Sequence, residues 1–259
     1  MSEHCYALTS CVQARAELIV ERGPVAACIR SRGAPPIVLR QTGPHRAHLV
    51  GAAGGPLGGD DLALDVRLGA GATLELRSAA ATVVQAGGHP AAARWTVASS
   101  LAAGAELDWR PEPTVVCDGA ELRSRMTVDV QRGAQATLRE VVVLGRASQH
   151  GGRYHGELAV DFDGAPLLHH TLLLDGADPA LVGPAGTGGA HVVGMLAVVG
   201  EGVERPAPGS GEELGLRWAC SPLDGPGWVL LALGARAIDV TRVLDEAVFD
   251  RSKSRSSRD

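Results

Sequence analysis

The sequence predicts a mainly β fold, a layered, superhelical and β-helix-like stack of antiparallel hairpins with about two α-helices near the C-terminal part. Three observations predict it. Four segments repeat an alternating strand, a Gly-Ala turn and a second strand, and the turn glycines lie 33, 29 and 31 residues apart. Aromatic residues make up only 3% of the chain, while 34 residues are glycine. A near-constant period indicates stacked supersecondary units, although evenly spaced hairpins of a β-sandwich would give the same pattern.

The first repeat spans residues 62 to 78. Apolar residues at every second position from Leu62 to Leu68 place one face of a strand in the interior, and Gly71-Ala72 then turns the chain. The other repeats are Trp95 to Trp109 with a turn at Gly104-Ala105, Met126 to Leu144 with a turn at Gly133-Ala134, and Leu158 to Leu174 with a turn at Gly164-Ala165. Because an isolated hairpin is marginal in water, stacking is needed to give the repeats a shared core.

Three segments follow the repeats. Gly188 to Val199 is apolar throughout, which fits a buried helix and fits a strand almost as well. Glu201 to Glu213 is rich in Gly, Pro and Glu and is predicted to be a loop. Ala235 to Phe249 carries its apolar residues on one helical face and is predicted to be an amphipathic helix.

The domain organisation follows from the same patterns. Residues 1–13 are predicted to be an N-terminal extension, residues 14–250 a single β domain, and residues 251–259 a disordered basic tail without apolar residues. A chain of 259 residues with 45% hydrophobic residues is long enough to bury a sizeable core. No apolar run approaches the roughly 20 residues of a membrane helix, and no signal peptide is evident.

Charge and composition exclude several functions. The net charge is −5, and because the basic tail contributes +3, the remaining body carries −8, which disfavours nucleic-acid binding. The single lysine, Lys253, excludes a Walker A site and a buried Schiff-base lysine. The five cysteines include no C-x-x-C pair, so we expect free thiols and a reducing, cytoplasmic setting without membrane association.

No motif of an enzyme is present, so the residues of interest are polar groups that interrupt apolar patterns. Asp60 precedes the first strand, Glu112 lies between two prolines, and Glu140 adjoins the run from Val141 to Leu144. A solvated carboxylate is the ordinary interpretation of each, and any that proves buried needs a cation or a hydrogen-bond partner. His169 and His170 are neighbours on a strand, so at most one of them faces inward.

The ordered succession of several segments resembles the UreD/UreH family of urease accessory proteins. The segments that carry the resemblance are GGPLGGDDLALDVRLGAGATL (54–74), AAATVV (79–84), PEPTVVCDGAELRSRM (111–126), REVVVLGR (139–146) and GELAVDFDGAPLLHHTLLLDG (156–176), followed by the C-terminal helix. Together they cover roughly residues 14 to 249. Each motif alone is weak, whereas their order along one chain is specific.

The resemblance implies a protein that is not an enzyme. Members of this family are scaffolds between apo-urease and a UreF-like and a UreG-like accessory protein, and the assembly delivers nickel to the urease active site. No tightly bound cofactor is implied, since Ni²⁺ passes through only transiently. Ni²⁺ accepts carboxylate and imidazole ligands, and a path of isolated ligands would let the ion move on, as in channels.

The resemblance also implies which residues line that path. They are Asp60, Thr82, Glu112, Glu140 and His170. Asp60 matches the family's Gly-Gly-Asp motif, Thr82 a hydroxyl position, and Glu140 an acidic position before the Leu-Gly-Arg sequence. Glu112 stands where glutamine is common, and His170 where relatives often carry glutamate.

Two other functions remain open from the residues alone. One is a β-helical enzyme that acts on carbohydrate with paired carboxylates, which the scarcity of aromatic residues disfavours. The other is a β-sandwich interaction module without a metal role.

Overall fold

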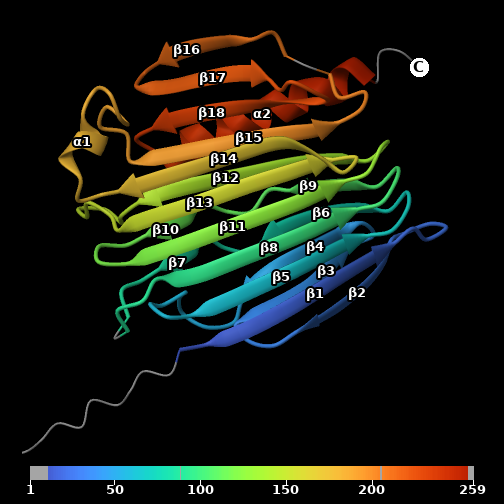
Figure 1. Ribbon diagram of the computed structural model, residues 1–259, viewed down its shortest axis with the longest axis horizontal. Coiled ribbons are helices and arrows are strands. Elements are labelled where there is room, and N and C mark those ends of the chain that lie inside the picture. Colours follow the sequence, from blue (N-terminus) through green and yellow to red (C-terminus); the bar gives the residue numbers. More distant parts are fainter. Residues whose placement is uncertain (1–10, 88, 205, 256–259) are drawn as a thin grey trace, which may run out of the picture.

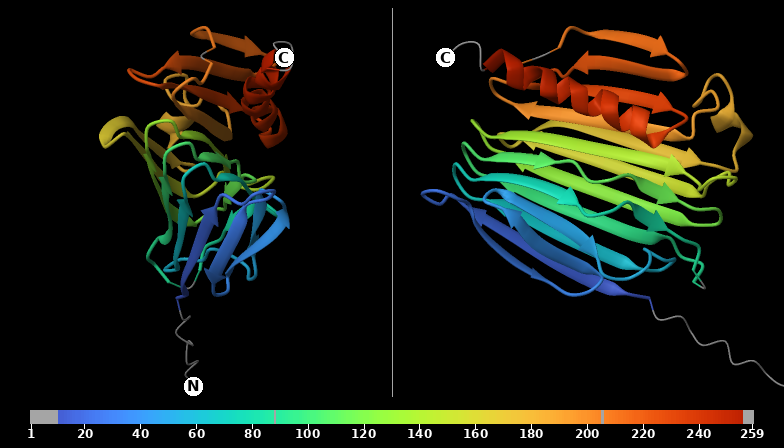
Figure 2. Two further views of the ribbon diagram at one scale, coloured as in Figure 1. Left: turned by 90° about the vertical axis from the view of Figure 1, so that its right-hand side faces the viewer. Right: turned by 180° about the vertical axis from the view of Figure 1, so that it is seen from behind.

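Alternating apolar residues give most strands one inward face, and the strands assemble into two sheets around a shared core (Figures 1 and 2). The structure is a computed structural model that describes residues 11–87, 89–204 and 206–255, the last seven of these as backbone only. Of the predicted N-terminal extension, residues 1–10 lie outside the described residues.

Sheet A has seven strands. In spatial order they are β14 (Ala165–Asp175), β13 (Arg153–Phe162), β11 (Glu121–Val130), β8 (Ala93–Leu101), β5 (Asp61–Leu68), β1 (Gln13–Glu21) and β2 (Cys28–Gly33). The ladders from β1 through β5, β8 and β11 to β13 are parallel, and antiparallel strands close both edges.

Sheet B has eleven strands. Nine follow in the order β16 (Gly209–Glu213), β17 (Leu216–Pro222), β18 (Gly227–Gly234), β15 (Val192–Gly200), β12 (Gln135–Leu144), β9 (Glu106–Trp109), β6 (Thr73–Ser78), β4 (Arg46–Gly51) and β3 (Ile37–Gly43). The short strands β10 (Thr114–Val116) and β7 (Thr82–Val84) continue the sheet beside the far end of β12. The two helices are α1 (Pro179–Val182) and α2 (Ala237–Arg255).

The predicted stack of repeats is confirmed, but most of the turns are not hairpins. The turns at Gly71, Gly104 and Gly133 each lead from a strand of sheet A to a strand of sheet B, and successive repeats pair in parallel. Only the turn at Gly164 closes an antiparallel hairpin, between β13 and β14. Alternation reports which face of a strand is buried, not which strand it pairs with, so the pattern could not separate the two arrangements.

The Gly-Ala pairs suit turns that pass from one sheet to the other. Each turn glycine has a positive φ, between +64° and +80°, which side chains rarely adopt. The following alanine is fully buried at positions 72, 105 and 134, because it fills the end of the interior between the sheets. Ala165 is exposed, since the hairpin at Gly164 has no second sheet to turn into.

The structure decides between the two alternatives for residues 188–199, corrects the predicted loop 201–213 and adds a short helix. Val192–Gly200 is strand β15 and not a helix, and all nine residues are buried because sheet A covers one face and α2 the other. The predicted loop 201–213 contains the edge strand β16, which pairs with β17 through its backbone. The short helix α1, capped by the Asp178 side chain, was not predicted.

Helix α2 confirms the predicted C-terminal helix and extends it. It continues to Arg255, into the segment predicted to be a disordered tail, while residues 256–259 lie outside the described residues. The helix packs closely on β15, since a Cβ at Gly194 would lie 2.5 Å from the side chain of Val240 and 2.8 Å from that of Leu244.

Two further expectations concern thiols and membranes. Cys11, Cys28, Cys117 and Cys220 are free thiols, and Cys5 lies outside the described residues. Within the described part of the chain, no helix is both long and apolar enough to cross a membrane.

Candidate functional site

Sheet B is interrupted on one side of β12, where two strands stop and restart while β12 runs through. β9 ends at Trp109 and its continuation β10 begins at Thr114. Pro111 and Pro113 lie between them and have no N–H to donate, so the ladder cannot continue. The Glu112 N–H instead donates to Ser78 Oγ at 2.8 Å. The PEP sequence therefore ends one strand and starts the next.

The interruption widens with distance from β12. On one side of it Leu138, Trp109 and Leu76 lie in register, and on the other side Val142, Thr114 and Thr82 do. Between these two rows β12 has three residues (139–141), the next strand path has four (110–113) and the third has five (77–81). Each added residue makes the chain bulge and separates the ladder further.

A cavity of about 400 Å³ lies between the sheets at this interruption. It separates two apolar clusters of the interior, as β12 illustrates: Leu138 belongs to one cluster, Val142 to the other, and Glu140 between them lines the cavity. Much of the wall is apolar, including Trp95 and Trp109. Its polar groups include Asp60, Ser78, Thr82, Gln85, Glu112, Thr114, Ser124, Arg139, Glu140 and Arg146.

Four of the five residues assigned to the metal path line this one cavity. They are Asp60, Thr82, Glu112 and Glu140, from four separate parts of the chain. His170 is not among the lining residues. The structure thus brings four of the five candidates together, and their role in a metal path stays a prediction.

Asp60 has a structural task in the wall. It is 6% exposed, and its Oδ1 accepts from the Val12 N–H at 2.8 Å while its Oδ2 accepts from the Leu57 N–H at 2.9 Å. The carboxylate therefore ties the start of β1 to the turn that precedes β5. Two backbone donors satisfy this buried charge without a metal.

Glu140 and Tyr154 form a hydrogen-bonded pair, in which Tyr154 is buried and Glu140 is half-buried. The Tyr154 hydroxyl donates to a carboxylate oxygen of Glu140. Burial raises the pKa of Glu140 above its ordinary value, although the hydrogen bond from Tyr154 acts in the opposite direction. Burial and the adjacent Glu140 charge raise the pKa of Tyr154 well above its ordinary value. The pair provides a carboxyl group whose charged form is disfavoured until a further positive or hydrogen-donating partner arrives.

Tyr154 was missed in the sequence analysis, although Gly156 was a usable signal. The two residues share the inward face of β13, and a Cβ at Gly156 would lie 2.5 Å from the Tyr154 ring. The missing side chain leaves space for the ring to lie along the strand toward Glu140.

Glu112 and Thr82 lie at the solvent side of the interruption. Glu112 is exposed and lines the cavity, which makes it a residue of the cavity mouth, and Thr82 is half-buried beside Thr114. From the mouth inward the wall therefore offers the solvated carboxylate of Glu112 and then a half-buried hydroxyl and a half-buried carboxyl group.

His170 faces inward from β14, at the edge of sheet A. It pairs with the buried Leu158 and is half-buried, whereas His169 is exposed, as expected for neighbours on a strand. Burial lowers the pKa of His170, so its imidazole is neutral at pH 7 and keeps a free lone pair.

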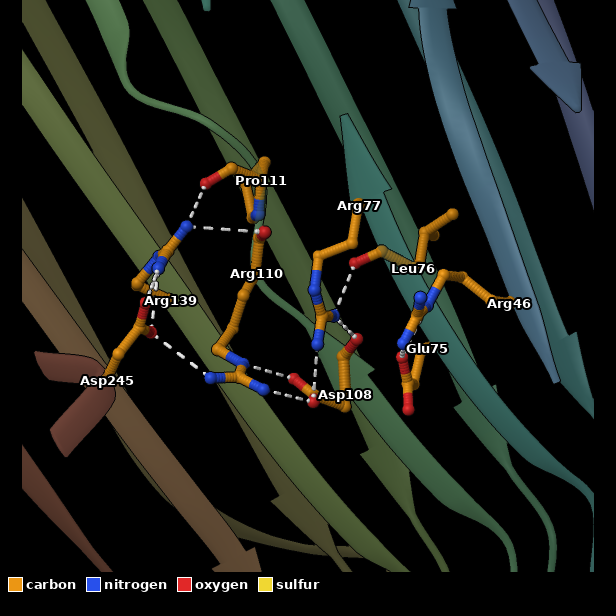
Figure 3. A network of polar contacts seen from close by, with 9 residues as sticks. All are labelled: Arg46, Glu75, Leu76, Arg77, Asp108, Arg110, Pro111, Arg139 and Asp245. Atoms are coloured by element: carbon orange, nitrogen blue, oxygen red, sulfur yellow. Dashed lines mark hydrogen bonds and ion pairs between the residues drawn. The ribbon is translucent and has the colours of Figure 1, made fainter. Parts of the chain in front are cut away.

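A network of charged side chains lies on the other face of the interruption, toward α2 (Figure 3). Asp108 accepts from Arg77 Nη2 and from Arg110 Nε and Nη2, each at 2.7 Å. Burial alone would raise the pKa of Asp108, but hydrogen bonds and charges from Arg110 and Arg77 outweigh burial and lower it. Asp245 of α2 binds Arg110 Nη1 at 3.2 Å and Arg139 Nη1 at 2.7 Å. No pattern in the sequence predicted this network.

Among the described residues, no group of three or more His, Cys, Asp or Glu side chains could hold a metal ion. Resident sites for Zn²⁺ or Ca²⁺ use at least three protein ligands at fixed distances. The oxygen-bearing residues Asp60, Thr82, Glu112 and Glu140 of the cavity wall come instead from separate parts of the chain.

Comparison with known sequences agrees with the resemblance. A model of the family described as UreD urease accessory protein matches residues 13–253. A urease accessory protein UreD from Frankia alni is 39% identical over 273 residues, covering 90% of this chain and 91% of the relative. Similar proteins of that name occur in Parafrankia sp. (38% identical, 95% of this chain and 91% of the relative) and Streptomyces avermitilis (38%, 83% and 87%).

Proposed function

The chain belongs to the UreD family of urease accessory proteins, and we propose that it is a non-enzymatic nickel-insertion chaperone. In this proposal it works in the cytoplasm as a scaffold for a UreF-like and a UreG-like protein on apo-urease. Ni²⁺ crosses the interior of the scaffold as cargo on its way to the urease active site.

One observation carries the proposal. Asp60, Thr82, Glu112 and Glu140 were assigned to a metal path from the sequence, and all four line the cavity at the interruption of sheet B. Asp60 has both carboxylate oxygens engaged by backbone donors. The moving ion is therefore offered the Glu112 carboxylate, the Thr82 hydroxyl and Glu140 in turn.

The chemistry of Glu140 supports passage of an ion. A divalent cation would lower the pKa that burial raises, so the carboxyl group would release its proton as the ion arrives. Among the described residues, Tyr154 is the side chain that donates to Glu140, which therefore offers a single carboxyl group that can bind and then release. Conduction requires sites that are favourable enough to enter and weak enough to leave. His170, with a neutral imidazole at the edge of sheet A, would serve as a separate ligand.

The scaffold role is tested by co-expression of this chain with apo-urease and the UreF-like and UreG-like proteins, followed by affinity capture. We expect one stable assembly that contains all four components. Failure to form any complex under all conditions of salt and stoichiometry would contradict the scaffold role.

The nickel path is tested by Glu140→Ala in the same assembly. We expect unchanged complex formation and urease activation reduced by about tenfold at limiting nickel, the scale on which loss of a single group weakens a metal site. Asp129→Ala is the matched control, because Asp129 is an exposed carboxylate on the outer face of the neighbouring sheet. Full activation by the Glu140 variant at limiting nickel would remove this residue from the path.

A further inference from the structure

Arg139 links the helix α2 to the mouth of the cavity. Its Nη1 lies 2.7 Å from both carboxylate oxygens of Asp245, and its Nη2 donates to the Pro111 carbonyl at 2.7 Å and to the Arg110 carbonyl at 3.4 Å (Figure 3). The Arg139 side chain is 5% exposed. One buried guanidinium therefore binds a helix on one side and the interrupted strand on the other.

The carbonyls that Arg139 binds belong to the segment where the ladder between β9 and β12 is interrupted. The ladder between β9 and β12 ends at the pair Trp109 and Leu138, and it resumes only at Thr114 and Val142. Residues 110–113 lie outside the ladder, and buried carbonyls without donors are destabilising. Arg139 provides these donors, and the residue that follows the bound carbonyl of Pro111 is Glu112 of the cavity mouth.

Asp245 holds Arg139 in the orientation that this task needs. It also binds Arg110 Nη1 at 3.2 Å, so one carboxylate fixes both the arginine that donates and an arginine of the interrupted strand itself. Arg110 is held from its other side by Asp108 through two hydrogen bonds of 2.7 Å. The planar guanidinium has five donors in a fixed geometry, which lysine cannot reproduce.

The charged network also adjoins Glu140, the carboxyl group that lines the cavity. Arg139 and Glu140 are consecutive residues of β12, so their side chains leave opposite faces of the sheet. The β12 backbone at both residues is held by its continuous ladder with β15. The Arg139 side chain therefore acts on the segment that carries Glu112, opposite Glu140 on the same strand.

We infer that Arg139 is a positioning residue for the metal path and that Asp245 makes the cavity mouth depend on the seating of α2. The inference rests on the proposed function for its consequence in nickel delivery. Its structural half stands independently, because it concerns the order of residues 110–114 and not the cargo. Displacement of α2 would release Arg139, free the two carbonyls and let the segment with Glu112 move.

The first test is hydrogen exchange of the full chain, with Arg139→Lys as the variant. Lysine keeps the positive charge for Asp245 but cannot reach both Asp245 and the strand carbonyls with a planar fork. We expect amide exchange at Glu112 and Thr114 to accelerate by at least about tenfold, the scale of losing hydrogen bonds from a charged donor. Protection in β5 and β8 should be unchanged.

The matched control is Arg242→Lys. Arg242 lies on α2 and binds Asp239 at 3.2 Å, but its side chain is 61% exposed and donates to no strand carbonyl of the described residues. It should leave exchange at Glu112 and Thr114 as in the unaltered chain. Asp245→Asn should accelerate exchange there more than Arg139→Lys. If the Asp245 variant fails to fold, the lysine variant alone decides.

The second readout is urease activation by the co-expressed assembly. Arg139→Lys should bind its partners normally, reduce activation several-fold at limiting nickel and recover at excess nickel, as a distorted but unblocked path would. Unchanged exchange at Glu112 and Thr114 overturns the inference whatever the cargo. A second outcome also overturns the inference: Arg139→Lys accelerates exchange but activates urease fully, while Glu140→Ala impairs activation. If neither variant impairs activation, the proposed nickel path fails, and the inferred role in that path fails with it.

Discussion

The two sheets are built by the same passes of the chain and nevertheless differ. In sheet A, β5, β8, β11 and β13 pair in parallel from end to end without interruption. In sheet B the corresponding paths break between β9 and β10 and between β6 and β7. The regular repeat thus makes sheet A a continuous wall. In sheet B, one added residue in each successive strand path opens the interruption.

The side chains follow the same division. Opposite the interruption, sheet A contributes mainly apolar residues to the cavity, such as Leu62, Val97 and Met126, whereas sheet B contributes Thr82 and Glu140. Consistency across local rules specifies a fold, and departures from those rules concentrate at functional sites. The difference between the sheets therefore indicates where function is placed.

The largest expected effect is a difference in the free energy of unfolding between substitutions in the filled interior and at the cavity. Leu64→Ala in β5 removes a fully buried side chain from the continuous sheet and should lower the free energy of unfolding by about 2–5 kcal/mol. Thr82→Ala in β7 removes a half-buried side chain beside existing empty space and should lower it by no more than about 1 kcal/mol. Chemical denaturation of both variants measures the contrast, and equal losses would contradict the division into a filled and an open region.

The strands, their inward faces and the period of the repeat were predictable because alternation and glycine turns are local signals. The pairing of strands was not. The sequence does carry one hint of the interruption: Thr-Val-Val at 82–84 and at 114–116 corresponds in register to Val142–Leu144. These segments begin 11, 10 and 9 residues after the glycines of their turns. The distance from the turn glycine to the segment thus changes by one residue from each repeat to the next, and this difference is the added residue in each strand path.

The candidate site was predictable only in part. Asp60, Thr82, Glu112 and Glu140 were found through a resemblance, and the fold brings them to one cavity, while His170 lies elsewhere. The role of Tyr154 could not be predicted, because the sequence does not show that its ring reaches Glu140. Arg139 and Asp245 are 106 residues apart, so no local pattern could join them. Contacts of that kind depend on tertiary packing, which a single sequence does not reveal.

A smaller effect on stability is expected at Gly156 of sheet A, beside the Tyr154 ring that reaches Glu140 of sheet B. Gly156→Ala would place a Cβ 2.5 Å from the Tyr154 ring. The ring must shift from Glu140, and we expect about 1–3 kcal/mol of destabilisation from overpacking, with loss of the Tyr154–Glu140 hydrogen bond. Gly209→Ala is the control, because no atom lies within 4 Å of its added Cβ. Thermal unfolding, together with the ultraviolet absorbance of tyrosine, reports both changes.

The opposite outcome would also be informative. If Gly156→Ala is as stable as Gly209→Ala, sheet A is not constrained by the pair across the cavity, and the two walls are less coupled than the geometry indicates.

The smallest effect depends on pH and contrasts the interior of the opening with its mouth. Burial raises the pKa of Glu140 in the folded protein, so the folded state holds this proton more tightly than the unfolded chain does. The contribution of Glu140 to stability is therefore full below the ordinary glutamate pKa and is lost as pH rises through the raised pKa. Glu140→Gln removes this titration while its amide oxygen can still accept from Tyr154.

The variant should become more stable, relative to the unaltered chain, as pH rises from acid to neutral. Thermal unfolding across that pH range is the measurement, and Glu112→Gln at the exposed mouth should track the unaltered chain. A constant difference in melting temperature between the Glu140 variant and the unaltered chain would mean that the Glu140 carboxyl group titrates as it does in water, which would place it in contact with bulk solvent and remove the contrast between the two ends of the cavity.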